Sequence, residues 1–492
     1  MAAAGRPAAG ALSAGGSEWD RLDWRAIERT VKRLQVRIAQ AARQGRPGKV
    51  KALQWLLTHS FSAKAWAVRR VVRNRGRRTA GVDGVRWRTP RQKMAAIRSL
   101  QRQGYRPQPL RRIYIPKRNG KRRPLSIPTM KDRAMQALHA LALGPVAEMQ
   151  ADRNSYGFRP GRSTADALGQ CFIALAKGYS ARSVLEGDIQ SCFDKLSHSW
   201  LLDNVLMDSR VLGAWLKAGY VESSKLFPTE EGTPQGGIIS PLLANIALDG
   251  LEDAARTAVP PRSKVNVVRY ADDFVITCGS KELLVDKVVP AIEVFLAQRG
   301  LNLSPDKTRI TALEEGFDFL GANVRKYDGI LLMKPSKKVV LRFINDVRRF
   351  LKTHRSITTV RLIKALNAKI RGWAYQFRHL VSQRAFNQID YQVGTSLWRW
   401  VKRRHPKKSA SWLRRTYFRS HDGRWVFTAR ERDKGHVRHV DLFIAGRVSI
   451  IRHVKIRAEA CQFDPQYNDY FRQRRLKGHH RAGPRQINDP VF

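Results

Sequence analysis

Cysteine is scarce in this chain, and its four residues, Cys171, Cys192, Cys278 and Cys461, never form a CxxC pair. Their spacing argues against a disulfide framework and against a zinc finger or ribbon. We expect the first three to be small buried side chains. No uninterrupted apolar segment is long enough to span a bilayer, and no signal-peptide pattern is present. The sequence therefore predicts a soluble, intracellular protein that has no membrane partner.

Acidic residues are also few compared with basic ones. The 492 residues include 92 Lys and Arg but 40 Asp and Glu, which gives a formal net charge of +52. Repulsion among so many positive charges opposes compaction unless a polyanion neutralises them, so nucleic acid is the predicted partner. The length of the chain predicts several domains rather than one core.

The first part of the chain reads as a tail followed by helices. Residues 1–17 are rich in Ala and Gly, lack a core pattern and are predicted to be disordered. From Trp24 onward, apolar residues recur every three or four positions with Arg and Lys between them, which predicts a basic amphipathic helix. Its apolar members are Ile27, Val31, Leu34 and Ile38. Farther along, the sequence predicts a strand over 317–324 and a helical region from about 337.

Two adjacent carboxylates, Asp272 and Asp273, lie between two apolar runs that are rich in β-branched residues. This pattern predicts a hairpin with strands buried on at least one face and the acids at its turn. Two carboxylates held close together repel, and a divalent cation such as Mg²⁺ relieves that repulsion. A solvated Asp-Asp turn explains the pair equally well, so these residues alone leave a metal site and a surface turn open.

Two other segments carry polar side chains in suggestive places. Asp188 ends an apolar strand over 183–188, where a metal ligand can be held rigidly. Asp194 follows closely and is better explained as an N-terminal helix cap. Gln235 lies among glycines that permit close backbone approach, so it could contact a base, a sugar or a primer strand. By itself, however, the Gln235 segment predicts only a turn.

A basic hairpin is predicted over 110–128, where an Asn-Gly turn joins two apolar strands. Lys117 and Arg123 lie near its tip, and their cationic groups could close over a triphosphate. A solvated basic turn is the equally simple alternative for these two residues.

Taken in chain order, these segments resemble the sequence blocks of a reverse transcriptase, and specifically of a bacterial group II intron-encoded protein. The resemblance covers nearly everything from Trp24 to Arg475. The segments that carry it are the Arg111–Pro128 hairpin, the Tyr156–Ser163 loop, Asp188 with Phe193 five positions later, Thr233–Gly237, Tyr270–Asp273 and Phe319–Gly321. Two later segments, 370–377 and 397–406, resemble the maturase or thumb domain of the same proteins.

The resemblance implies an α+β fold with the right-hand architecture of polymerases. Fingers and a palm with an antiparallel sheet would be followed by an α-helical thumb or maturase domain and a basic C-terminal DNA-binding region. The implied units are 18–104 for the basic helical N-terminal extension and start of the fingers, 105–330 for fingers and palm, 331–425 for the thumb, and 426–492 for the C-terminal region. Many members continue into an HNH endonuclease with paired cysteines, but here only Cys461 lies in the tail, so second-strand cleavage is not expected.

The resemblance also implies roles for individual residues. Asp188, Asp272 and Asp273 would be the catalytic carboxylates that hold two Mg²⁺ ions, with Mn²⁺ as a possible substitute. Phe193 would exclude a ribose 2′-hydroxyl, although a core aromatic remains the alternative. The implied nucleotide-binding residues are Lys117, Arg123, Phe193, Gln235 and Lys307. The implied RNA- or template-binding residues are Arg69, Arg70, Arg159, Arg371 and Arg399.

On this resemblance the chain is an RNA-directed DNA polymerase, a nucleotidyltransferase, with group II intron RNA, a DNA target and primer, and dNTPs as partners. It would assist splicing of the intron and copy it into cDNA by target-primed reverse transcription during retrohoming, in the cytoplasm and at the nucleoid. One alternative is an RNA-binding splicing factor with a decayed polymerase site, against which the intact carboxylates argue. Another is a domesticated relative in repair or phage defence, which genomic position would distinguish. The oligomeric state and the intron's identity are not specified by these residues.

Overall fold

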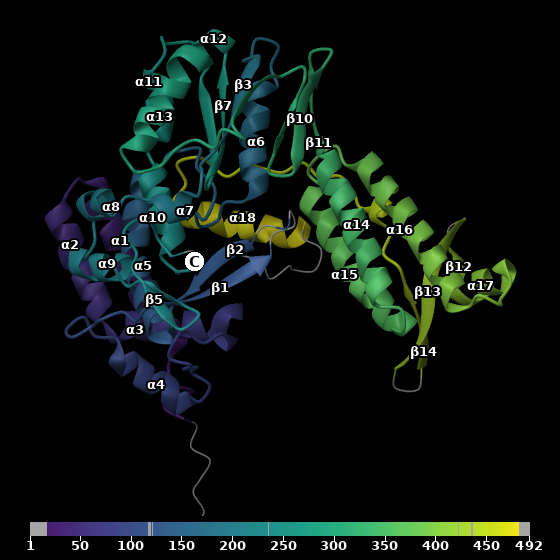
Figure 1. Cartoon of the computed structure of the whole chain (residues 1–492), viewed down its shortest axis with the longest axis horizontal. Helices are drawn as coiled ribbons and strands as arrows, with labels where there is room; N and C mark the ends of the chain where they lie inside the picture. The colour runs from purple at the N-terminus through teal and green to yellow at the C-terminus, as the bar shows by residue number, and fades with distance from the viewer. Residues whose placement is uncertain are drawn as a thin grey trace, which may run out of the picture.

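The computed structural model describes residues 17–481, apart from 117–119, 121, 235, 422 and 434–435, so the predicted tail lies outside it except for Ser17. We call the four-stranded sheet with the order β6-β7-β3-β8 the central sheet, and Figure 1 labels its strands β3 and β7. The strands are β3 (Ser183–Asp188), β6 (Asn266–Tyr270), β7 (Asp273–Cys278) and β8 (Arg309–Ala312). All neighbouring pairs are antiparallel. Helices surround this sheet, which confirms the mixed α+β architecture.

Both faces of the central sheet are buried because successive residues of its strands enter different hydrophobic clusters. Leu185 packs in one cluster and Val184 in the other, and Val267 and Val268 divide in the same way. The first cluster includes α1 (Trp24–Arg43), α5 (Met130–Gln150), α10 (Ser240–Leu248) and α13 (Val289–Ala297). The second includes α6 (Thr164–Leu175), α14 (Lys337–Thr353), α15 (Thr359–Phe377) and α16 (Gln383–Arg404). Burial on both faces explains why the strands read as apolar runs rather than as alternating patterns.

The helix predicted from Trp24 is confirmed as α1. Asp23 caps α1 by accepting hydrogen bonds from the backbone N–H groups of Arg25 and Ala26. The predicted apolar face of α1 is buried, as Ile38 illustrates with no exposed surface. The next helices are α2 (Pro47–His59), α3 (Phe61–Arg73) and α4 (Pro90–Ser99). All four cysteines are buried and unpaired, as expected for the first three. No helix in the described part of the chain is both long and apolar enough to cross a bilayer.

The basic hairpin is also present. Strand β1 (Leu110–Pro116) pairs antiparallel with β2 (Arg122–Ile127), so that Ile115 lies opposite Arg123. Two short strands not predicted from the sequence, β4 (Tyr220–Glu222) and β5 (Lys225–Phe227), extend this sheet in the order β2-β1-β4-β5. Strand β1 pairs in parallel with β4, and this pairing joins the hairpin to a part of the chain about 110 residues later.

Two local predictions were wrong. The strand predicted over 317–324 is a hairpin, because Leu320 and Gly321 turn the chain with φ values of +49° and +83°. It forms β9 (Phe317–Phe319) and β10 (Ala322–Tyr327), and β11 (Ile330–Pro335) completes a three-stranded sheet. Asp194 does not cap a helix either: Ser191 occupies the N-cap position of α7 (Cys192–Lys195), and Asp194 lies inside that helix.

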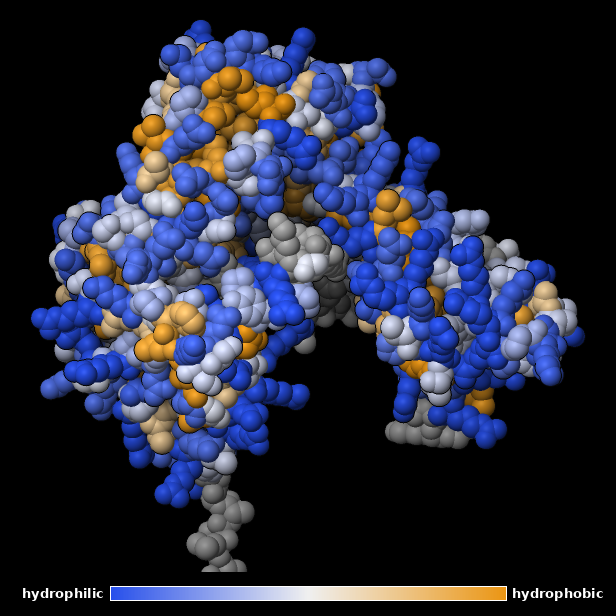
Figure 2. All heavy atoms as spheres, viewed as in Figure 1, coloured by the Kyte–Doolittle hydropathy of each residue, from blue (hydrophilic) through white to orange (hydrophobic). Residues whose placement is uncertain are grey.

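A lobe of long helices follows, seen beside the central sheet in Figure 1 and covered largely by hydrophilic residues in Figure 2. It contains α14, α15, α16 and α17 (Ala410–Tyr417). The helical region predicted from about residue 337 is confirmed, and Trp373 is buried as part of its core. A three-stranded sheet of β12 (Phe418–His421), β13 (Arg424–Asp433) and β14 (His436–Asp441) adjoins it, and the predicted domain limit at 425 falls within β13.

The C-terminal segment returns to the N-terminal half. Arg43 Nη1 on α1 lies 2.6 Å from Asp464 Oδ2. Buried Asp166, on α6, accepts hydrogen bonds of 2.8 Å from His453 Nε2 and from Arg474 Nη2. Burial opposes ionisation of this carboxyl, but the hydrogen bond and charge of His453 prevail and lower its pKa to about 2. The segment before and within α18 (Asn468–Arg481) is therefore fixed to the protein.

The close packing of β3 on β7 predicts a large effect at Gly187. A Cβ atom there would lie 2.2 Å from the ring of Phe274, which is 1% exposed and has no room to move. We expect Gly187→Ala to lower the free energy of unfolding by about 1–3 kcal/mol in equilibrium urea denaturation. Gly394→Ala on α16 is the control, since a Cβ there meets nothing within 4 Å. The control should gain up to about 1 kcal/mol, and equal effects of the two changes would contradict the packing described.

Candidate active site

Three predicted carboxylates lie together where β3 ends and β7 begins. Asp188, the last residue of β3, is the direct cross-strand partner of Asp273, the first residue of β7. Residues directly opposite in an antiparallel pair present their side chains to the same face. Asp272 lies in the adjoining turn, because Tyr270 pairs with Asp273 and leaves only Ala271 and Asp272 between the strands. The hairpin predicted from the sequence is therefore confirmed, with its two acids beside the third.

The turn is held in an unusual conformation by a neighbouring loop. Ala271 has a φ of +59°, which non-glycine residues adopt at a cost. Gly157 presses on it so closely that a Cβ atom would lie 2.3 Å from the Ala271 nitrogen. The backbone of β6 fixes this loop: Tyr156 N donates to Arg269 O at 2.9 Å, and Arg269 N donates to Asn154 O at 3.0 Å. Glycine is required at 157 because no side chain fits between loop and turn.

A buried polar network supports the same turn from behind. Arg269 is 1% exposed, and its guanidinium donates to Asp249 and, at 3.3 Å, to Asn245 Oδ1. Asn245 Nδ2 in turn donates to Gly157 O at 2.8 Å. Burial, assisted by the charge of Asp152, raises the pKa of Asp249 to about 6, although the charge of Arg269 opposes this. Sequence reasoning missed these residues; the available signal was an arginine inside an apolar strand, directly before Tyr270.

Burial, together with the crowding of three carboxylates, disfavours ionisation of Asp272 and Asp273. Although Asp273 reaches solvent, the surrounding protein and then the charges of Asp272 and Asp188 raise its pKa to about 7. Burial, followed by the charge of Asp188, also raises the pKa of Asp272. The positive charges of Lys307 and Arg123 offset part of this effect at Asp272.

The structure brings the predicted residues Lys307 and Arg123 to the carboxylates. Lys307 Nζ lies 2.7 Å from Asp188 Oδ2, and this hydrogen bond raises the pKa of Lys307. The lysine side chain is 65% exposed, whereas Asp188 is 13% exposed, so the cation covers the carboxylate from the solvent side. Arg123 is exposed on β2, within electrostatic range of Asp272. Lys117 and Gln235 lie outside the described residues.

Phe193 lies on α7, next to the loop that presses on the turn. Its half-buried ring meets that of Phe158 edge-on, with centroids 6.4 Å apart. Phe158 also lines a cavity of about 670 Å³ together with Gly236 and two predicted RNA contacts, Arg69 and Arg70. The Arg69 guanidinium lies 4.4 Å from the ring centre of Trp24, and burial lowers the pKa of Arg70 to about 10, which leaves it charged at neutral pH.

The other predicted RNA-binding arginines differ in their access to solvent. Arg159 is buried, and its Nε and Nη2 donate to Glu148 while its Nη1 donates to backbone carbonyls. This side chain therefore supports its own loop instead of offering a charge to RNA. Arg371 is half-buried over the ring of Phe443, 4.9 Å from its centre. Arg399 alone of these three is exposed, on α16.

The carboxylates fit a hard divalent cation by their chemistry. Mg²⁺ prefers carboxylate oxygens, and a cation between Asp188, Asp272 and Asp273 would relieve the repulsion that helps to raise the pKa values of Asp272 and Asp273. The side-chain positions in the described part of the chain do not by themselves form a group of three or more His, Cys, Asp or Glu that could hold a metal ion, so the fit rests on ligand chemistry and on the pairing of Asp188 with Asp273. The ammonium of Lys307 provides the positive charge at Asp188.

The raised pKa of Asp273 predicts how stability depends on pH without metal. A carboxyl whose pKa is raised from 3.8 to about 7 on folding binds its proton more tightly in the folded state. That stabilisation is complete at acid pH and is lost as pH rises through about 7. Asp273→Asn mimics the protonated form. In the presence of a metal chelator, its free energy of unfolding relative to that of the wild type should increase as pH rises from 5 to 8, as measured by urea denaturation. A difference independent of pH would contradict the electrostatics described.

Three family models match the chain in succession. The N-terminal domain of reverse transcriptase matches residues 19–100, and reverse transcriptase (RNA-dependent DNA polymerase) matches residues 115–324. The group II intron maturase-specific domain matches residues 340–418. A reverse transcriptase domain implies dependence on a divalent metal ion, and the maturase-specific domain implies intron RNA as a partner.

Two known proteins are similar to this chain in sequence. Protein YkfC of Escherichia coli K12 is 33% identical over 299 residues, which cover 52% of this chain and 78% of that protein. Group II intron-encoded protein LtrA of Lactococcus lactis subsp. cremoris is 31% identical over 348 residues, 57% of this chain and 55% of LtrA. The chain thus spans about half the length of LtrA. A telomerase structure from Candida albicans matches with a TM-score of 0.35 at 13% identity over 63% of this chain and 64% of that one, too distant to inform the fold. From the family models and these relatives, the chain belongs to the group II intron reverse transcriptases, RNA-directed DNA polymerases that also carry a maturase domain.

Proposed function

We propose that this chain copies a group II intron RNA into DNA at Asp188, Asp272 and Asp273 and assists the splicing of that intron, as part of retrohoming into a DNA target. The observation that carries the catalytic assignment is the direct pairing of Asp188 with Asp273 across β3 and β7, with Asp272 in the adjoining turn. Two carboxylates on paired strands and a third in the adjoining turn form an acidic site at one end of these strands, in a protein whose formal net charge is +52.

The three aspartates would hold two Mg²⁺ ions, for which Mn²⁺ could substitute. Such ions, when bound, acidify the primer 3′-hydroxyl and stabilise the leaving pyrophosphate. The protein's own contribution is to fix the carboxylates through the Gly157 contact and the buried Arg269 network, and to balance charge with Lys307 and Arg123. The side chains of Lys307 and Arg123 both have access to solvent, so they could contact the phosphate oxygens of a bound triphosphate.

The nucleotide pocket extends from this site toward Phe193. Its ring is held by Phe158 and by α7, so it can lie under the incoming sugar and exclude a 2′-hydroxyl by contact. Lys117 and Gln235 would complete the pocket, on the strength of the sequence pattern alone. We assign the hairpin to the fingers and the β6-β7-β3-β8 sheet to the palm.

Nucleic acid would lie along the basic surfaces on either side. The 670 Å³ cavity with Arg69 and Arg70 opens beside Phe158 and Gly236, where a template strand would pass the catalytic turn. Helices α14 to α17 would form the thumb, with Arg399 exposed to the duplex, and the basic region after residue 425 would contact the DNA target. Contacts of this kind weaken steeply as salt concentration rises.

Primer extension on an RNA template tests the catalytic assignment. Asp272→Asn and Asp188→Asn should each lower extension by at least about a thousandfold, because the carboxylates act as a unit. Binding of the same template-primer, measured by filter retention, should persist, which separates chemistry from binding. Absence of metal-dependent extension by the wild-type protein would leave only an RNA-binding splicing factor.

The position of Phe193 predicts sugar discrimination. Phe193→Val should raise incorporation of ribonucleotides relative to deoxynucleotides by roughly 10- to 100-fold, because one steric contact contributes about 1–3 kcal/mol of selectivity. Phe172→Val on α6 serves as the control, since that ring is exposed and lies outside the described site. Unchanged discrimination in Phe193→Val would show that this ring is only part of the core.

A further inference from the structure

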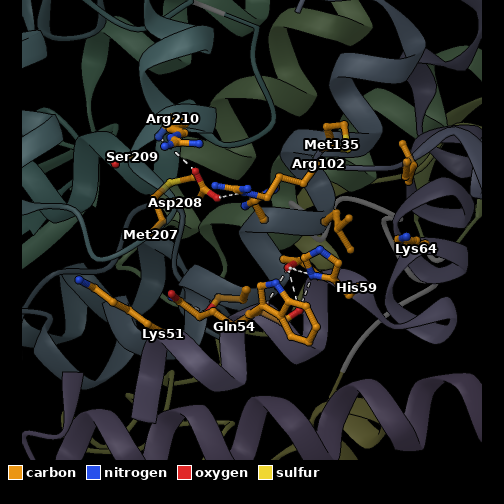
Figure 3. A pocket seen from close by; sticks show the side chains of 16 residues that line it. Lys51, Gln54, His59, Lys64, Arg102, Met135, Met207, Asp208, Ser209 and Arg210 are labelled. Atoms are coloured by element: carbon orange, nitrogen blue, oxygen red, sulfur yellow. Dashed lines mark hydrogen bonds and ion pairs between the residues drawn. The ribbon is translucent and has the colours of Figure 1, made fainter. Parts of the chain in front are cut away.

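A separate cavity of about 480 Å³ lies between α2, α5 and the start of α9 (Ser209–Leu216), as Figure 3 shows. None of its lining residues belongs to the carboxylate site or to the cavity beside Phe158. The proposed polymerase mechanism therefore makes no use of it. Its volume falls in the range of small-ligand pockets.

The floor of this cavity is apolar and uncharged. Met135, Leu138 and Ala142 of α5 form it together with Leu100 and Met207, and all five are buried. His139, also in the floor, is buried edge-on to Trp215 at 5.4 Å between ring centroids. Burial lowers the pKa of His139 to about 4, so this imidazole is neutral at pH 7. A flat, uncharged ring system suits such a floor.

An aromatic pair stands at the mouth. Trp55 is 57% exposed, and its ring stacks on His59 with centroids 4.2 Å apart. His59 Nδ1 donates to the Trp55 carbonyl at 2.8 Å, which fixes the pair on α2. An indole left this exposed beside a cavity provides a surface on which a nucleobase can stack.

The rim carries more positive charge than it can pair. Arg102 is bonded to Asp208, the acidic residue of the lining. Lys51, Lys64 and Arg210 form no ion pair with any residue in the described part of the chain, and they lie on different sides of the group of lining residues (Figure 3). An apolar floor, an exposed aromatic and an unpaired cationic rim together match a base attached to a phosphate.

We propose that this cavity binds one unpaired nucleotide of the RNA partner, with its base on the Trp55 side of the apolar floor and its phosphates on Lys51, Lys64 and Arg210. The choice of RNA as the ligand rests on the proposed function, because the maturase-specific domain implies an intron RNA partner. Duplex RNA cannot use the site because its bases are already paired and stacked.

The site shares helix α5 with the catalytic side of the protein. Gln136, next to Met135 of the floor, accepts a hydrogen bond from Ile238 N at 2.8 Å. Ile238 follows the Gly236–Gly237 segment that lines the cavity beside Phe158. RNA held in the α2–α5–α9 cavity would thus rest on one face of the helix whose neighbouring face supports the proposed template path.

Photo-crosslinking with a single-stranded RNA that contains 4-thiouridine tests the proposal on the full chain. Mass spectrometry should find the nucleotide adduct on the α2 peptide that contains Trp55 and His59. Trp55→Ala should lower the yield of this adduct by about fivefold or more, because stacking contributes at least about 1 kcal/mol per base. Phe61→Ala is the matched control, since Phe61 is 49% exposed on the adjacent helix and does not line the cavity; it should leave the yield unchanged.

A charge-matched pair of variants keeps the test informative if Trp55→Ala misfolds. Lys51→Gln with Arg210→Gln should lower the yield more than Arg46→Gln with Lys49→Gln, which removes the same charge from exposed positions outside the cavity. Equal losses in the two pairs, equal adduct formation by duplex RNA, or no adduct on α2 would overturn the proposal. Competition by uridine monophosphate at concentrations at which unlabelled single-stranded RNA does not compete would assign the cavity to a free nucleotide and overturn the RNA source. Primer extension by the same preparation separates these outcomes from failure of the polymerase function.

Discussion

The pairing of β3 with β7 is the constraint on which the active site depends. Its register sets Asp188 opposite Asp273, and a shift by one residue would turn one carboxylate to the other face of the sheet. Packing fixes this register, because both faces of the sheet are buried in separate clusters and Gly187 leaves room for the ring of Phe274. Apolar packing on both faces of the sheet therefore sets the positions of the proposed catalytic acids.

The protein combines a large excess of positive charge with a cluster of carboxylates at its proposed active site. The chain carries a large positive excess, yet its proposed chemistry is concentrated where three carboxylates repel one another. Lys307 and Arg123 moderate that repulsion, and the buried pair of Arg269 and Asp249 holds the turn from inside the protein. Charges in the core fix geometry, since a buried ion pair tolerates little displacement. Charges on the surface remain available to a polyanion.

Long-range contacts join the parts into one framework. The C-terminal segment is anchored at Asp166 and Arg43, so the region after the helical lobe is attached to the N-terminal half. Helix α5 runs through the first hydrophobic cluster and supports two cavities on different faces. Ligands at either cavity would therefore act on a shared, nearly fully buried helix.

Local patterns in the sequence determined much of this protein. Apolar periodicity placed α1 and α14, the Asn-Gly turn placed the basic hairpin, and two β-branched runs placed the strands on either side of Asp272. These elements follow from interactions between residues close in the chain. Only the tertiary structure decided that Gly157 would press on Ala271, that Asn245 and Asp249 would hold Arg269, and that Arg159 would be buried on Glu148. Those contacts join residues from about 10 to more than 100 positions apart, and no local pattern encodes which distant backbone will approach a given turn.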